Sequence, residues 1–66
     1  MENKNFCLER LDSLIEHINA AKTYESRLYF ATKAEGFVDA LFYADVLNDA
    51  EFKTYYVKIE NAYLRK

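Results

Sequence analysis

Glycine and proline are nearly absent from this chain, which has one glycine, Gly36, and no proline in 66 residues. Tight turns and strand boundaries depend on these two residues, because glycine permits positive φ angles and proline fixes φ. A chain with almost none of them is expected to be helical. The spacing of the apolar residues supports this interpretation and predicts three helical segments.

The first segment covers residues 5–22, where apolar side chains recur every three or four positions. These are Leu8, Leu11, Leu14, Ile15, Ile18 and Ala21. Asn3 or Asn5 is the candidate N-cap. The next boundary depends on Thr23 as N-cap, with Glu25 in the first turn of the following helix. Because no glycine or proline separates the two segments, one long bent helix remains open as the alternative.

The second segment, residues 24–47, has two apolar stripes on adjacent faces. The first contains Phe30, Ala34, Phe37, Leu41 and Ala44. The second contains Tyr29, Gly36, Ala40, Tyr43 and Leu47. A helix that is apolar on more than one face is usually central in a fold or shared with a partner. Since Gly36 costs about 1 kcal/mol relative to alanine inside a helix, we predict that another backbone or side chain approaches it closely; a kink is the alternative.

The stretch VLNDAEF predicts the start of a third helix. With Asn48 as N-cap, Glu51 falls at the third helical position, which is the arrangement of a capping box. Asp49 favours the positive end of the helix dipole. Leu47 and Phe52 have the spacing of a hydrophobic staple. These polar residues are therefore interpreted as a cap and not as a reactive site.

The third helix is expected to cover residues 49–64. Its inner stripe consists of Phe52, Tyr55, Tyr56, Ile59, Ala62 and Tyr63. A weaker second stripe consists of Ala50, Thr54, Val57, Asn61 and Leu64. We predict an all-α fold with one domain, residues 1–66, in which three helices pack together. The second and third helices form an antiparallel hairpin through a short turn at residues 47–48.

The size of the chain limits its core, because folding buries only about 60% of the surface that an unfolded chain of this length exposes. One cysteine, Cys7, excludes an intrachain disulfide and fits a reducing compartment. We expect no targeting leader and no membrane span, because no basic and apolar stretch opens the sequence and the apolar runs are much shorter than the roughly 20 residues of a membrane span. We expect a soluble, cytoplasmic protein that gains stability from a second subunit.

Catalytic or metal chemistry has little support in the sequence. Asp45, Asn48, Asp49 and Glu51 lack the alternating acids and the central glycine of a calcium loop. His17 and Cys7 are the two soft ligands, but their ten-residue separation on one helix places them about 15 Å apart.

The remaining acids, such as Glu35 and Asp39, alternate with basic residues such as Lys33. This pattern is typical of a solvated face, and a single glycine cannot build a phosphate loop. We expect no enzyme activity, no cofactor and no metal.

The predicted core does not account for all of the aromatic residues, which are six tyrosines and five phenylalanines. Three short helices cannot bury all of them, and tyrosine is enriched at interfaces because its ring can be buried while its hydroxyl stays wet. We predict a non-catalytic protein-interaction module that forms a homodimer. The predicted partner-binding residues are Tyr29, Gly36, Phe42, Tyr43, Val57 and Leu64.

Two other functions remain open. A helix-turn-helix regulator could use the basic residues Lys53, Lys58, Arg65 and Lys66. Asp49 and Glu51 would then repel phosphates at the start of its recognition helix, so nucleic acid is an unfavoured partner. In its short length and tyrosine-rich helical hairpin, the chain is similar to small inhibitor proteins of phages and other mobile elements. That resemblance implies inhibition of a host defence or regulatory protein.

Overall fold

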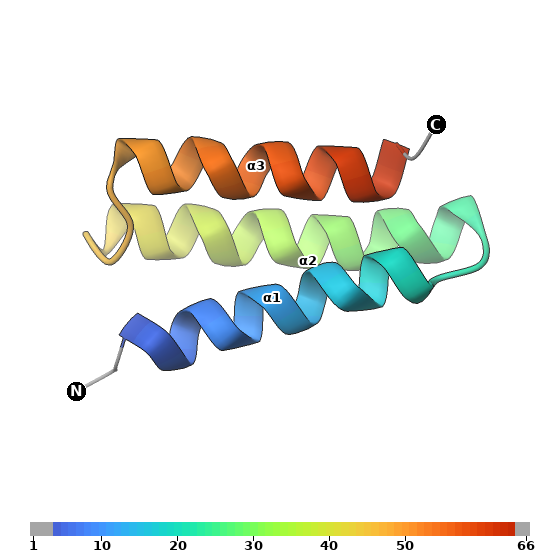
Figure 1. Cartoon of the computed structure of the whole chain (residues 1–66). Coiled ribbons are helices and arrows are strands. Elements are labelled where there is room, and N and C mark those ends of the chain that lie inside the picture. Colours follow the sequence, from blue (N-terminus) through green and yellow to red (C-terminus); the bar gives the residue numbers. More distant parts are fainter. Residues whose placement is uncertain (1–3, 65–66) are drawn as a thin grey trace.

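The computed structural model describes residues 4–64, which form three α-helices: α1 (Lys4–Ala20), α2 (Tyr24–Tyr43) and α3 (Asp49–Leu64). Figure 1 shows α2 antiparallel to both α1 and α3. Each outer helix packs mainly on α2 and less extensively on the other. The predicted all-α fold with a hairpin of α2 and α3 is confirmed. None of the helices within the described range is long and apolar enough to cross a membrane.

Residues 21–23 separate α1 from α2, so the alternative of one long bent helix is wrong. Thr23 is the predicted N-cap of α2: its backbone is extended, and its hydroxyl oxygen accepts a hydrogen bond from the Ser26 N–H at 3.1 Å. This bond satisfies one of the free N–H groups at the helix start. Asn5 lies inside α1 and is not its cap, whereas Asn3 lies outside the described residues.

The second helix ends at Tyr43, four residues before the predicted end. The chain turns through Asp45, which has a φ of 63°. The Val46 N–H donates to the Leu41 carbonyl at 2.8 Å, and the Asp45 N–H donates to the Phe42 carbonyl at 3.0 Å. These two bonds form a Schellman motif, which usually has glycine at its left-handed position. Aspartate also tolerates this conformation, so the helix ends here without a glycine.

The core contains apolar residues from all three helices and from the turn before α3. They are Cys7, Leu11, Ile18, Ala31, Ala34, Val38, Leu41, Leu47, Ile59 and Ala62. The predicted stripe of α2 omits Ala31 and Val38, and its Phe30 and Phe37 are only partly buried. Ala44, also on that stripe, is exposed as the C-cap of α2. The buried face of α2 is turned further towards α3 than predicted, because α2 packs against two helices at once.

Candidate interaction surface

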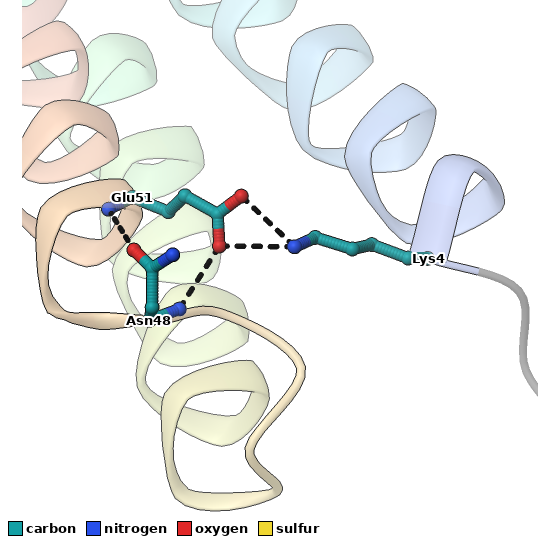
Figure 2. A network of polar contacts seen from close by, with 3 residues as sticks. All are labelled: Lys4, Asn48 and Glu51. Carbon is teal, nitrogen blue, oxygen red and sulfur yellow. Dashed lines mark hydrogen bonds and ion pairs between the residues drawn. The ribbon is translucent and has the colours of Figure 1, made fainter.

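The polar cluster between α2 and α3 is a helix cap. The Glu51 N–H donates to Asn48 Oδ1 at 2.8 Å, and the Asn48 N–H donates to Glu51 Oε1 at 2.9 Å (Figure 2). The predicted capping box is therefore confirmed. Lys4 of α1 reaches the same carboxylate, with its Nζ 2.9 Å from Oε2. The Asn48 N–H and the Lys4 ammonium group both lower the pKa of Glu51.

The contact between Lys4 and Glu51 joins the start of α1 to the start of α3, as Figure 2 shows. Its two residues are 47 positions apart, so no local pattern in the sequence could predict it. The pair is solvent-exposed, and such pairs contribute little stability on their own. Within residues 4–64, no three His, Cys, Asp or Glu side chains are grouped so that they could hold a metal ion.

His17 and Cys7 occupy separate environments on α1. His17 is exposed; its Nδ1 donates to the Ser13 carbonyl at 2.7 Å, and its ring lies 5.2 Å from that of Phe30. Cys7 is only 5% exposed and belongs to the core. The structure therefore does not bring His17 and Cys7 together.

Large apolar side chains are exposed on every helix of the described chain. They are Phe6, Tyr24, Leu28, Tyr29, Tyr43, Val57 and Leu64. Four of the predicted partner-binding residues are among them, and Tyr43 is the most exposed at 82%. Tyrosine rings in water leave apolar area that a partner could cover. Their role in binding stays a prediction.

Three of the predicted residues, Tyr29, Gly36 and Tyr43, form one line along α2, which we call the outer stripe. They are seven residues apart, so they share a face of the helix, and all three are exposed. A Cβ atom added at Gly36 would meet no atom within 4 Å. The predicted close approach to Gly36 is therefore wrong within this chain. The approach of a partner molecule and the kink stay as the two alternatives.

A shallow groove of about 390 Å³ runs beside the outer stripe, between α1 and α2. It is lined by Arg10, Leu14, Lys33, Gly36, Phe37 and Ala40. Arg10 and Lys33 place two positive charges around an apolar floor, and no carboxylate lines the groove. Lys33 Nζ also lies 5.1 Å from the centre of the Tyr29 ring, within the range of a cation–π contact. We call Arg10 and Lys33 the basic flank.

The opposite side of α2, towards α3, has negative charge. Burial and the nearby carboxylates of Glu60 and Asp39 raise the pKa of Glu35. Asp39 accepts a hydrogen bond from the Tyr56 hydroxyl at 2.9 Å. Burial and this bond raise the pKa of Tyr56 to about 12. We call Glu35, Asp39 and Glu60 the acidic flank.

The other predicted partner-binding residues lie apart from the outer stripe. Phe42 is partly buried, and its ring lies 4.4 Å from that of Phe52, so it serves the packing of α2 on α3. Val57 and Leu64 are about half exposed and share one face of α3. The structure thus divides the six predicted residues between two helix surfaces and one interior contact.

The arrangement of α2 and α3 bears on nucleic-acid binding. The two helices lie side by side in opposite directions (Figure 1), whereas the helices of a helix-turn-helix cross at about 90–120°. The basic residues Lys53 and Lys58 lie on α3, and Arg65 and Lys66 lie outside the described residues. The fold therefore adds no support to the regulator hypothesis.

Comparisons of this chain with protein-family models, with curated proteins and with solved structures found no match.

Proposed function

We propose that this protein is a non-catalytic interaction module that self-associates through the outer stripe of α2. The observation that carries the proposal is the exposure of Tyr29 and Tyr43, at 58% and 82%, on the same helix face as the exposed Gly36. Because one tyrosine lies on each side of the glycine, a second helix can approach α2 closely at the centre and pack against a ring at each end.

The dimensions of the molecule are compatible with such an interface. A specific interface takes about 800 Å² from each partner, which is about a sixth of the 4658 Å² of accessible surface of this chain. The Cα atoms extend over 35 × 20 × 14 Å, so the protein is flattened and offers broad faces. Covering the outer stripe and the groove beside it would supply apolar burial that the small core lacks.

Sedimentation equilibrium at micromolar concentrations tests the proposal. We expect the mass to rise above 7.8 kDa with concentration, and the melting temperature to rise with it. Tyr43→Ser should weaken association, while Tyr24→Ser, which removes a half-exposed ring at the start of α2, should not. Circular dichroism of each variant would confirm that it is folded. A monomer at every concentration would contradict self-association.

A further inference from the structure

The basic and acidic flanks of α2 are not neutralised by ion pairs in the described chain. Among residues 4–64 the one ion pair joins Lys4 to Glu51, which belong to neither flank. The basic flank lies on the α1 side of the outer stripe. The acidic flank lies on the α3 side, because Asp39 is bonded to Tyr56 of α3 and Glu60 belongs to α3 itself. Charges of opposite sign on the two sides of one exposed helix are complementary to those of a second copy of the same chain.

Symmetry then decides the direction in which two α2 helices can pack. Dimers of identical chains usually have a twofold axis. When the axis runs along parallel α2 helices, the α1 side of each copy lies over the α3 side of the other. When the helices are antiparallel, the α1 sides face each other, and so do the α3 sides. Like charges that face each other destabilise an interface, so the charge distribution favours the parallel arrangement.

We propose that two copies form a twofold-symmetric dimer in which the outer stripes of α2 pack in parallel, with the basic flank of each copy against the acidic flank of its partner. This inference rests on the proposed self-association and adds the orientation and the charge pairing that fixes it. A second copy complements both flanks in a single contact.

The register of the dimer follows from the position of Gly36, which lies midway between the two tyrosines of the stripe. The helices approach most closely at the glycines, so each Tyr29 lies near the partner's Tyr29 and each Tyr43 near the partner's Tyr43. Lys33 is two residues from Glu35 in the sequence, so it lies about 3 Å along the helix axis from the level of the partner's Glu35.

Cysteine cross-linking tests the orientation directly. In a Cys7→Ala background, Tyr43→Cys alone should form a covalent homodimer under mild oxidation, and so should Tyr29→Cys alone. Thr54→Cys, on the exposed surface of α3, is the control for random collisions and should give little product. If Cys7→Ala prevents folding, the same variants with the buried Cys7 retained serve instead.

Each result has a distinct meaning. An antiparallel dimer would place Tyr29 beside the partner's Tyr43, so a covalent product that forms only from a mixture of the two cysteine variants would overturn the parallel orientation. That outcome would leave self-association intact. A wild-type protein that stays monomeric in sedimentation would overturn both the proposed function and this inference.

Charge reversal provides an independent test of the pairing between the flanks. The double variant Arg10→Glu/Lys33→Glu should associate with itself at least about tenfold more weakly than the wild type, because acidic groups would then face acidic groups. The double variant Glu35→Lys/Glu60→Lys should show the same loss. An equimolar mixture of the two should associate again. Failure of the mixture to associate while each variant remains folded would overturn the charge pairing.

Discussion

Asn48 is the N-cap of α3. Its Oδ1 accepts a hydrogen bond from the Glu51 N–H, and its own N–H donates to the Glu51 carboxylate. Asn48→Ala should therefore lower the free energy of unfolding by about 1 kcal/mol, within the range of roughly 0.5–2 kcal/mol for lost caps. Urea unfolding measures it. Asn61→Ala makes the same chemical change at an exposed position within α3 and should not destabilise. Equal effects of the two substitutions would show that the cap contributes nothing specific.

Asp45 follows the C-cap of α2 and has a left-handed backbone with a φ of 63°. Glycine adopts this conformation without the steric cost that a Cβ imposes. Asp45→Gly should therefore raise the free energy of unfolding by up to about 1 kcal/mol. Ala44→Gly, one residue earlier with a φ of −87°, should instead destabilise. Thermal unfolding of both variants decides whether the left-handed position limits stability here.

The start of α3 and the end of α2 show which single-residue features the sequence could predict. The cap of α3 depends on Asn48 and Glu51, which are three positions apart, so their side-chain chemistry is enough. The end of α2 depends on Asp45 adopting a conformation that glycine normally marks, and nothing else in the sequence indicates it. The contact of Lys4 with Glu51 depends on the packing of α1 beside α3, which only the folded chain establishes.

At the level of helices, the bond from Tyr56 to Asp39 joins α3 to α2. Burial, then the bond to Asp39, raises the pKa of Tyr56 from 10.0 in the unfolded chain to about 12. A group whose pKa is higher in the folded state gives up its proton first in the unfolded state, so its contribution is complete below pH 10 and is lost as the pH rises towards about 12. The pKa values of Tyr55 and Tyr63 are also raised.

We therefore expect the free energy of unfolding to fall between about pH 10 and pH 12. Tyr56→Phe should make this fall shallower and should cost about 1 kcal/mol at neutral pH through loss of the hydrogen bond. Urea unfolding at a series of pH values, with the protein kept dilute, measures both effects. An unaltered pH dependence in Tyr56→Phe would contradict this role of the bond.

The surfaces of the helices were predictable only in part. The seven-residue spacing of Tyr29, Gly36 and Tyr43 is sufficient to place them on one face. The basic flank was not predictable, because Arg10 and Lys33 become neighbours only when the register of α1 on α2 is known. For the same reason the sequence could not show that Phe42 packs on α3.

At the scale of the whole molecule, the balance between core and surface favours a dimer. No residue of the buried core is larger than leucine or isoleucine, whereas the phenylalanines and tyrosines are partly or well exposed. A chain of this size gains little from a single core, and it has one cysteine and therefore no intrachain disulfide to compensate. Covering exposed rings with a second copy would add the apolar burial that the monomer does not achieve.

Gly36 separates the stability of the monomer from that of the dimer. Because a side chain there meets nothing within 4 Å, Gly36→Leu should stabilise the isolated chain, by several tenths of a kcal/mol from helix propensity. In the dimer the same side chain would hold the two α2 helices apart, so self-association should weaken at least about tenfold. Thr54→Leu, at an exposed position on α3, should also stabilise through helix propensity but should leave self-association unchanged. Thermal unfolding of dilute protein and sedimentation equilibrium measure the two effects separately, and a Gly36→Leu variant that dimerises as well as the wild type would exclude the glycine as the crossing point.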